Sequence, residues 1–413
     1  MEYGLIGARL GHSYSPEIHS KLGDYDYRLY EIDEATFRAL LRARTFRGLN
    51  VTMPYKRIAF EECDVLSEAA REVGCVNTLV VRPDGALWGH NTDIGGFIAM
   101  AERAGVTLAG QKCAILGSGG ASLTAQAACR RMGAREIVVV SRSGPVNYEA
   151  LKREHRDVGA LINTTPVGMY PNNGASPLTL SDFPRLNGVL DVIYNPDKTN
   201  LILEAEGRGI PCAGGLYMLV EQAREAAEYF TGHPISRDQR NRIYGDLRAE
   251  ALNLVLVGMP GSGKSTIGRQ LAREMGRTFI DCDEEIERRA GMSIPTIFAE
   301  KGEAVFRDME SAVIEDVCRE RSRVIAMGGG AILRRGNVQA MRQNAAVLML
   351  ERDIDRLSRK GRPLSSSRHA VYELWAQRES LYRSASDAVI DNNGTLEDAL
   401  SAAKEAFYEI ARH

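Results

Sequence analysis

The chain of 413 residues is longer than one ordinary domain, and a typical domain size of about 100–200 residues predicts two to four domains. Apolar residues make up 44% of the chain and charged residues 26%, as in ordinary globular proteins. The formal net charge of −2 at pH 7 excludes a general electrostatic attraction to nucleic acid or to an anionic membrane surface.

No apolar run approaches the roughly 20 residues that a membrane-spanning helix needs. Residues 1–6 lack the basic and apolar segments of a secretory signal, so we expect no export. The seven cysteines form no C-x-x-C pair, which favours reduced thiols in the cytoplasm over a disulfide framework. The seven histidines never occur at H-x-x-x-H spacing, and the sequence contains no metal-ligand cluster of that kind.

Short apolar runs alternate with helical patterns along the first hundred residues. Strands are predicted at 3–7, 27–32 and 48–52, with a helix at 35–43, and this order favours a mainly parallel sheet. The alternation restarts at Lys112, and a long amphipathic helix at 216–230 follows it. The strands predicted between these points lie at 113–117, 136–140, 159–163 and 188–193.

A domain boundary is predicted at 246–251, with a short linker, because a new apolar strand begins directly after this charged stretch. The strands predicted beyond it lie at 251–258, 278–281, 323–328, 346–351 and 388–391, with helices between them. The whole chain therefore reads as α/β, without internal repeats or low-complexity tracts.

The stretch "VLVGMPGSGKSTIGRQLA" at 255–272 combines a strand, a glycine-rich turn and a helix. Its G-x-x-x-x-G-K-S pattern is that of a P-loop, in which backbone N–H groups and the N-terminal end of a helix bind phosphate. Lys264 is expected to reach the β- and γ-phosphates, and Ser265 to bind Mg²⁺. A glycine-rich turn that matches by accident is the alternative, but the strand before and the helix after favour a nucleotide site. The predicted ATP-binding residues of this turn are Gly258, Gly261, Ser262, Gly263, Lys264, Ser265 and Thr266.

Charged residues that follow the P-loop indicate a hydroxyl acceptor. Asp281 and Asp283 lie two residues apart at the end of a strand, where they suit a metal ion and a hydroxyl group, or merely cap the next helix. Arg307 and Glu310 are predicted to share a helical face. Further residues lie in three short segments, namely the glycines 328–330, the basic group Arg359, Lys360 and Arg362, and the pair Arg378 and Arg383. Scattered arginines are usually solvated, which is the alternative for each of them.

Taken in order, P-loop, D-x-D, F-R-x-x-E, G-G-G, R-P-L and R-x-x-x-Y, residues 252–413 resemble shikimate kinase. The resemblance implies that Asp283 deprotonates the acceptor hydroxyl, that Asp281 and Ser265 support Mg²⁺, and that Arg362 binds ATP from a lid. The predicted catalytic residues of the kinase are Asp283, Lys264 and Arg362. The implied shikimate-binding residues are Asp283, Arg307, Gly329 and Arg378.

A second glycine-rich turn, "GSGGAS" at 117–122, follows a strand and opens a helix. It approximates the dinucleotide fingerprint G-x-G-x-x-G, but Ser122 stands at the third glycine, so a plain strand–helix turn is the alternative. The next strand ends with Ser141, Arg142 and Ser143 instead of an acidic residue. A cation and hydroxyls favour the 2′-phosphate of NADP, unless Arg142 is an ordinary surface residue.

Residues 1–248 resemble shikimate dehydrogenase through eight stretches in the family's order. The stretches are "GHSYSPEIH", "NVTMPYK", "GCVNTL", "GHNTDIGGF", "GSGGAS", "NTTPVGM", "DVIYNPDKT" and "GGLYMLVEQA". The resemblance implies that Lys56 donates the proton to the substrate carbonyl, with Asp93 as its catalytic partner. The implied substrate-binding residues are Ser13, Ser15, Thr52, Lys56, Asn77, Asp93, Tyr194 and Gln222. The implied NADP-binding residues are Gly117, Ser118, Gly119, Gly120, Ala121, Ser141, Arg142, Ser143, Thr164 and Gly215.

The two turns therefore indicate two nucleotides, NADP for hydride transfer and ATP with Mg²⁺ for phosphoryl transfer. The resemblances predict a bifunctional enzyme of aromatic amino-acid biosynthesis that acts on 3-dehydroshikimate and shikimate. The predicted domains are a substrate domain at 1–106 completed by 216–246, a Rossmann domain at 107–215, and a P-loop kinase domain with a parallel sheet at 247–413. Two alternatives remain. The N-terminal half could sense a ligand without turnover, or the dehydrogenase could use quinate as its substrate. The sequence leaves the oligomeric state open.

Overall fold

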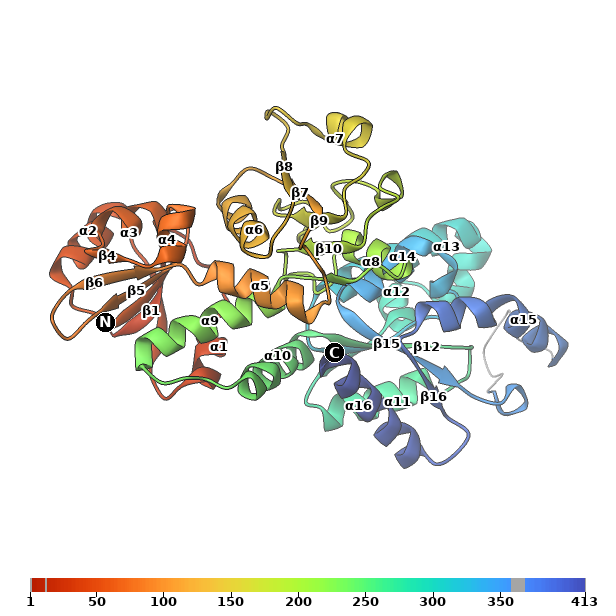
Figure 1. The fold of residues 1–413 in the computed structure, drawn as a ribbon. Helices are drawn as coiled ribbons and strands as arrows, with labels where there is room; N and C mark the ends of the chain where they lie inside the picture. The colour runs from red at the N-terminus through yellow and green to blue at the C-terminus, as the bar shows by residue number, and fades with distance from the viewer. Residues whose placement is uncertain (1, 12, 358–367, 413) are drawn as a thin grey trace. The chain divides into compact units, whose positions relative to one another are not determined.

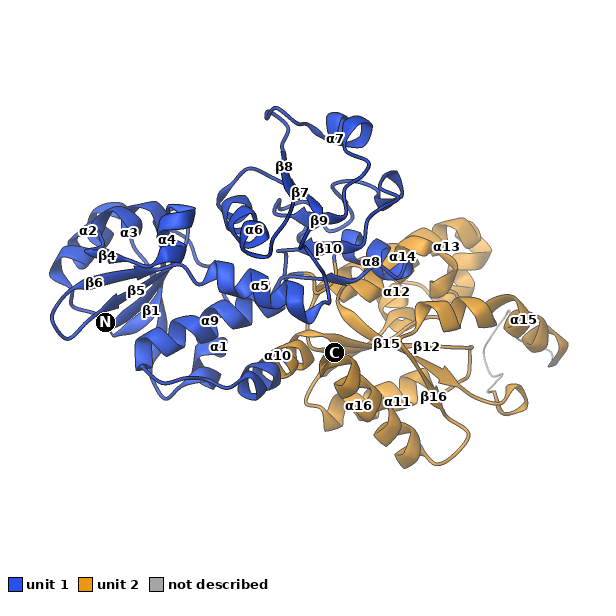
Figure 2. Cartoon of the chain, viewed as in Figure 1, with its two compact units in different colours: residues 1–195, 199–244 blue, residues 196–198, 245–413 orange. Residues whose placement is uncertain are grey.

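The computed structural model describes residues 2–11, 13–357 and 368–412. The chain forms two compact units, coloured separately in Figure 2. Unit 1 comprises Met1–Asn195 and Thr199–Tyr244, and unit 2 comprises Pro196–Lys198 and Gly245–His413. Unit 1 contains two β-sheets and unit 2 contains one, and helices cover the faces of all three (Figure 1). The α/β fold predicted from the sequence is therefore confirmed.

The first sheet of unit 1 has six strands in the order β2-β1-β3-β5-β6-β4. Its strands are β1 (Tyr3–Gly7), β2 (Tyr27–Glu31), β3 (Gly48–Val51), β4 (Val65–Leu66), β5 (Thr78–Val81) and β6 (Leu87–His90). The sheet is mainly parallel, as predicted, because three of its five strand pairings are parallel; the exception is β5, which is antiparallel to both β3 and β6. The stretch "RPDG" between β5 and β6 is a turn signal for this hairpin, and the sequence reading missed it.

Alternation of side chains along the strands gives this sheet two apolar faces. Tyr3 and Leu5 of β1 pack with Phe230 on one face, whereas Ile6 packs with Phe37 and its neighbours on the other. The helices of this region are α1 (Ser15–Leu22), α2 (Glu34–Ala43), α3 (Lys56–Glu62), α4 (Glu68–Val73), α5 (Asp93–Arg103) and α9 (Leu216–Thr231). Figure 1 shows α2, α3 and α4 on one side of the sheet and α1 and α9 on the other.

The second sheet of unit 1 is parallel throughout, in the order β11-β10-β9-β7-β8. Its strands are β7 (Lys112–Leu116), β8 (Glu136–Val140), β9 (Ala160–Asn163), β10 (Gly188–Asp191) and β11 (Cys212–Ala213). The short helices around it are α6 (Gly120–Arg131), α7 (Tyr148–Glu154), η1 (Leu180–Asp182) and α8 (Asn200–Gly207). Every residue of β7 is buried, because helices lie over both faces of a parallel sheet. The glycine turn at 117–119 follows β7 directly.

Unit 2 contains a five-stranded parallel sheet in the order β13-β14-β12-β15-β16. Its strands are β12 (Asn253–Val257), β13 (Thr278–Asp281), β14 (Arg323–Ala326), β15 (Ala345–Glu351) and β16 (Ala388–Asp391). Its helices are α11 (Lys264–Glu274), α12 (Cys282–Ala290), α13 (Ile294–Arg319), η2 (Ala331–Leu333), α14 (Arg335–Gln343), η3 (Ile354–Arg356), α15 (Arg368–Ala385) and α16 (Leu396–Arg412). The central strand β12 is fully buried, and the P-loop begins where it ends.

The helix α10 (Arg237–Ala251) runs directly up to β12 and contains the division between the units, after Tyr244. The predicted boundary at 246–251 falls inside the same helix, and the predicted domain limits stay a prediction. Among the described residues, no helix has both the length and the apolar character needed to cross a membrane.

Candidate active sites

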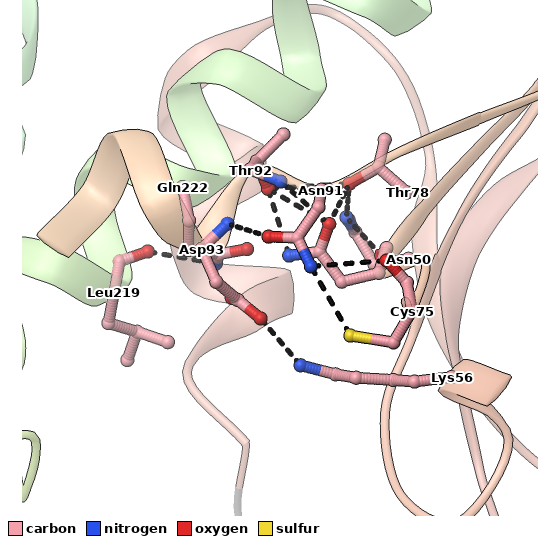
Figure 3. Close-up of polar contacts among 10 residues, drawn as sticks. Asn50, Lys56, Cys75, Thr78, Asn91, Thr92, Asp93, Leu219 and Gln222 are labelled. Atoms are coloured by element: carbon pink, nitrogen blue, oxygen red, sulfur yellow. Dashed lines mark hydrogen bonds and ion pairs between the residues drawn. The ribbon is translucent and has the colours of Figure 1, made fainter. Parts of the chain in front are cut away.

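Lys56 and Asp93 form the central ion pair of the first site, drawn in Figure 3. The Nζ atom of Lys56 donates to Oδ2 of Asp93 at 2.7 Å. Lys56 is the first residue of α3 and Asp93 the first residue of α5, so the pair joins two helix N-termini. The side chains are 29% and 16% exposed, respectively, which leaves the ammonium group accessible to a small ligand.

The pKa of Lys56 reflects two opposing effects. Burial lowers the pKa of its ammonium group, but the charge of Asp93 and the hydrogen bond to it outweigh burial and raise the pKa above its ordinary value. Lys56 is therefore a protonated, positioned donor at neutral pH. This arrangement can stabilise negative charge on a nearby oxygen and supply a proton to it.

A buried hydrogen-bond network fixes the start of α5. Oδ1 of Asn77 accepts from the backbone N–H of Thr92 at 2.9 Å, and Nδ2 of Asn77 donates to Oγ1 of Thr92 at 3.0 Å. The hydroxyl of Thr78 also donates to Oδ1 of Asn77, and Asn91 accepts from the backbone N–H of Asp93. The network therefore holds Asp93 in place, as Figure 3 shows for its labelled members.

Sequence reasoning missed several members of this network. Asn50 donates to Oγ1 of Thr78 at 3.0 Å, and Asn91 donates to Sγ of Cys75 at 3.4 Å. The available signal was the Asn-Thr pair that occurs both at the start of β5 and directly before Asp93. The repeated Asn-Thr pair can be seen in the sequence, but its contact cannot. The pairing of β5 with β6 brings the two Asn-Thr pairs together.

The other residues predicted to bind the dehydrogenase substrate include Ser13 and Ser15 near the start of α1, Tyr194 after β10, and Thr52 after β3. Ser13 and Ser15 have their hydroxyl oxygens 3.2 Å apart, and the ring of Tyr194 meets the edge of Tyr14 with centroids 5.8 Å apart. Tyr194 therefore lies beside the serine segment. Thr52 follows β3, and its backbone N–H donates to the carbonyl of Ile6.

Gln222 lies on α9, opposite the first turns of α5. A Cβ atom on Gly96 would lie 2.7 Å from the carbonyl oxygen of Met218 and 3.2 Å from Cβ of Gln222. The glycine therefore allows α5 and α9 to approach closely. The Gln222 amide donates to the carbonyl of Leu219 at 2.9 Å, as Figure 3 shows.

The glycine turn after β7 has the form of a phosphate cradle. Gly117 adopts φ of 108°, and a Cβ atom there would lie 2.7 Å from Oγ1 of Thr164. Gly119 caps α6 without a side-chain hydrogen bond, and nothing lies within 4 Å of a Cβ built on Gly119 or Gly120. Ser118 and Ala121 complete this turn. The open space and the helix N-terminus fit a pyrophosphate group.

The residues predicted to recognise the NADP 2′-phosphate follow β8 directly. Arg142 and Ser143 are exposed, and Ser141 is partly buried. Gly215 caps α9 in a close backbone contact, because a Cβ atom there would lie 2.2 Å from the carbonyl oxygen of Val192. The exposed guanidinium beside two hydroxyls fits a phosphate monoester.

The P-loop of unit 2 has glycines at positive φ, which its pattern predicts. Gly258, Gly261 and Gly263 have φ of 142°, 90° and 99°, which side chains with a Cβ rarely adopt. The Nζ atom of Lys264 donates to the carbonyls of Gly258 and Met259 at 2.9 and 3.0 Å, so it lies across the loop. Ser262 is fully buried, and Thr266 follows Ser265 in the first turn of α11.

Ser265 and Asp281 face one another beside the P-loop. The hydroxyl of Ser265 donates to Oδ2 of Asp281 at 2.6 Å. Asp281 also caps α12 by accepting from the backbone N–H of Asp283, so the capping role considered from the sequence is present as well. Burial and the charge of Asp281 raise the pKa of Asp283 to about 6, although Lys264 opposes this.

Two arginines reach the glycine segment 328–330 from different helices. Arg307 pairs with Glu310 at 2.9 Å, and both side chains are almost fully buried. A Cβ atom on Gly330 would lie 2.2 Å from Nη1 of Arg307. Arg378 donates from Nη1 to the carbonyl of Gly329 at 3.0 Å. Arg307, Arg378 and Gly329 therefore lie at one site, as the sequence predicted for an anionic ligand.

Comparisons with known proteins identify two families, one in each part of the chain. Residues 5–79 match the shikimate dehydrogenase substrate binding domain, and residues 260–411 match shikimate kinase. A shikimate dehydrogenase (NADP(+)) of Clostridium perfringens is 35% identical over 267 residues, which cover 60% of this chain and 98% of that protein. A shikimate kinase of Nitrosomonas europaea is 45% identical over 148 residues, covering 34% of this chain and 70% of that protein. The chain belongs to both families.

The chain is thus a fusion of a shikimate dehydrogenase with a shikimate kinase, as the sequence predicted. Two solved structures are similar to the dehydrogenase part. A chorismate mutase/shikimate 5-dehydrogenase fusion protein from Clostridium acetobutylicum is 34% identical, with a TM-score of 0.56 over 59% of this chain and 96% of that one. A quinate dehydrogenase from Corynebacterium glutamicum, solved with NAD, is 26% identical, with a TM-score of 0.54 over 59% of this chain and 98% of that one.

Arg359, Lys360 and Arg362 of the shikimate kinase part lie outside the described residues. The catalytic and ATP-binding role of Arg362 therefore stays a prediction. No group of three or more His, Cys, Asp or Glu side chains that could hold a metal ion occurs within the described ranges.

Proposed function

We propose that the chain catalyses two successive reactions, NADPH-dependent reduction of 3-dehydroshikimate and ATP-dependent phosphorylation of the resulting shikimate. The observation that carries the proposal is the presence of two phosphate cradles of different design. Each cradle is accompanied, in its own unit, by a separate set of catalytic side chains. The product of the first reaction is the acceptor of the second.

In the dehydrogenase, Lys56 protonates the carbonyl oxygen of the substrate as a hydride reaches the carbon. NADPH supplies that hydride when it is bound. Asp93 keeps Lys56 protonated and aligned through the contact at 2.7 Å. Ser13, Ser15, Thr52 and Tyr194 bind the carboxylate end of the ring, and Asn77 and Gln222 bind its hydroxyls.

This ion pair also favours turnover over ligand sensing by the N-terminal half. A sensing module needs groups that bind the ligand, but it has no need for a proton donor whose pKa an acidic partner maintains. Similarity to a quinate dehydrogenase keeps quinate as a second substrate to test. That ring carries one more hydroxyl than shikimate.

NADP recognition rests on the turn after β7 and the segment after β8. Backbone N–H groups of 118–121 bind the pyrophosphate at the N-terminus of α6. Arg142 binds the 2′-phosphate together with Ser141 and Ser143. Thr164, which contacts Gly117, and Gly215 would complete the cofactor site.

In the kinase, the P-loop residues bind the phosphates of ATP, and Lys264 exchanges its carbonyl partners for phosphate oxygens. Ser265 and Asp281 would hold Mg²⁺, because their oxygens already lie 2.6 Å apart. Mg²⁺ neutralises phosphate charge when it is bound. Arg307 and Arg378 bind the shikimate carboxylate, and Asp283 accepts the proton of the attacking hydroxyl.

Two assays on the purified chain test the proposal. The first follows reduced nicotinamide absorbance with 3-dehydroshikimate, comparing NADPH with NADH and testing oxidation of shikimate against that of quinate. The second measures ADP release from ATP and shikimate before and after chelation of divalent cations. We expect both activities, with chelation abolishing only the second. Absence of nicotinamide turnover would support the sensing alternative instead.

We also propose that the enzyme acts in the cytoplasm on small molecules, without nucleic-acid or membrane partners. The seven cysteines are free thiols, which supports a reducing compartment. Fractionation of cells that produce the chain tests this assignment.

A further inference from the structure

Arg352 lies directly after β15, next to the P-loop. Its Nη1 atom is 3.9 Å from the position that a Cβ atom on Gly263 would occupy. Gly263 immediately precedes Lys264, and its backbone belongs to the turn that binds phosphate. The guanidinium group of Arg352 therefore lies at the edge of the phosphate cradle, in a segment that the P-loop motif does not include.

The guanidinium group of Arg352 has an unsatisfied donor in this position. Its Nε atom is buried, and within the part of the chain that the structure describes it has no hydrogen-bond partner. Among the described residues, Arg352 forms no ion pair. The carboxylate of Glu351 pairs with Arg383 at 2.5 Å, and that of Asp353 lies 3.8 Å from Arg356. A buried guanidinium donor without a partner is costly, so the site fits an anion that arrives from outside.

A cavity of about 420 Å³ borders Arg352. Its lining includes Arg352, Asp353, Arg356, Tyr372, Trp375 and Asn393. Asn392, the neighbour of Asn393, donates to the carbonyl of Ser262 at 2.6 Å and so connects this wall to the P-loop. The cavity therefore borders a segment that is hydrogen-bonded to the P-loop, and it places aromatic side chains and the carboxylates of Glu351, Asp353 and Asp355 around the Arg352 guanidinium.

We propose that Arg352 binds the polyphosphate of the nucleotide, as a second phosphate-binding cation beside Lys264. This inference rests on the proposed kinase function and adds a residue to its nucleotide site. The planar guanidinium can donate two parallel hydrogen bonds to phosphate oxygens, which the single ammonium of Lys264 cannot do. The two cations approach the phosphates from different segments, Lys264 from the start of α11 and Arg352 from the end of β15, so Arg352 fixes the orientation of the polyphosphate.

Nucleotide fragments separate a phosphate contact from a general effect on the cavity. Binding of ADP, AMP and adenosine to the full chain is measured by titration calorimetry for the wild type and for Arg352→Met. We expect the substitution to weaken ADP binding by about ten- to a hundredfold, the usual size of a charge-assisted hydrogen bond, and to leave adenosine binding unchanged. The KM for ATP rises, whereas the KM for shikimate and the dehydrogenase rate stay at wild-type values.

Arg356→Met is the matched control. Arg356 lines the same cavity, but it is 57% exposed and already donates to the carbonyl of Asn393 at 2.8 Å. We expect ADP binding within about threefold of wild type, because exposed ion pairs contribute little. Arg352→Lys is a second variant, which keeps the positive charge but loses the paired donors of the planar guanidinium. We expect it to lose an intermediate amount of ADP affinity.

Unchanged ADP binding in Arg352→Met, or an equal loss of ADP and adenosine binding, would overturn the inference. If Arg352→Met does not fold, the Arg352→Lys protein decides by the same comparison of ADP with adenosine. Failure of the proposed function would look different, because the wild type would then bind ADP without phosphorylating shikimate.

Discussion

Removal of the Lys56 ammonium group is the most direct test of the dehydrogenase site. Lys56→Ala deletes the proton donor and leaves Asp93, 16% exposed, without its partner at 2.7 Å. The substitution shortens a partly exposed side chain at the start of α3, so we expect the fold of unit 1 to persist. The change therefore acts mainly on the chemistry.

The size of the effect follows from the role of the group. A positioned general acid contributes about 10²–10⁴-fold in rate, or about 3–5 kcal/mol of transition-state stabilisation. We expect kcat for 3-dehydroshikimate reduction to fall by that factor, with a smaller change in KM, because charge on the carbonyl oxygen develops only in the transition state.

Asp93→Asn tests the pairing separately. Without the Asp93 charge and hydrogen bond, the pKa of the Lys56 ammonium group loses the main contributions that raise it, and burial lowers it. Because reduction needs protonated Lys56, the decline of kcat/KM at alkaline pH should begin at a lower pH than in the wild type. A pH profile that keeps its alkaline limb unchanged would contradict this coupling.

The assay follows NADPH absorbance, and the kinase activity of the same molecules provides an internal control for folding. Arg57→Ala is the matched control variant, because Arg57 adjoins Lys56 but is 85% exposed, and within the described residues it pairs only with Glu61, at 3.4 Å. It should retain both activities. If Lys56→Ala reduced 3-dehydroshikimate within a few-fold of the wild-type rate, the proton-donor role would be wrong.

Four further outcomes are expected. Lys264→Ala abolishes ADP release in the kinase assay and leaves NADPH oxidation intact, because each lysine serves a separate nucleotide. Arg142→Ala weakens NADP⁺ binding about ten- to a hundredfold and spares NAD⁺, as fluorescence titration can measure; equal losses would point to another 2′-phosphate partner. Gly330→Ala raises the KM for shikimate more than that for ATP, because the new Cβ displaces the Arg307 guanidinium. Burial raises the pKa of Glu225 from 4.5 to about 7, so stability falls as pH rises through that window, and Glu225→Gln recovers up to about 3 kcal/mol at pH 8 but nothing at pH 4 in denaturant titrations.

Both phosphate cradles could be predicted from the sequence because each is a contiguous strand, turn and helix. Gly117, Gly258 and Gly263 each need positive φ, and this requirement leaves a direct mark in the sequence. The family resemblance supplied Lys56, which alone reads as a solvated lysine. Its partner Asp93 came from the same source, and the structure brings the two side chains together.

Features that depend on strand pairing could not be predicted in the same way. The antiparallel strand β5 brings Asn77 next to Thr92, and a parallel reading of this sheet gives the two residues no reason to meet. Arg352 is a similar case. It reads as one arginine among many, and only the order of strands β12 and β15 brings it to Gly263.

The three consecutive glycines after β14 form a motif that the sequence shows, but the reason for it appears only in the structure. None of them has positive φ, so backbone freedom does not explain them. Each one instead leaves space for a different neighbour. A Cβ atom would lie 2.5 Å from Oδ1 of Asp283 at Gly328, 2.7 Å from Cγ of Pro260 at Gly329, and 2.2 Å from Nη1 of Arg307 at Gly330. The glycines are therefore required by the side chains of the acceptor site and the P-loop that pack against them, and this requirement exists only in the folded unit.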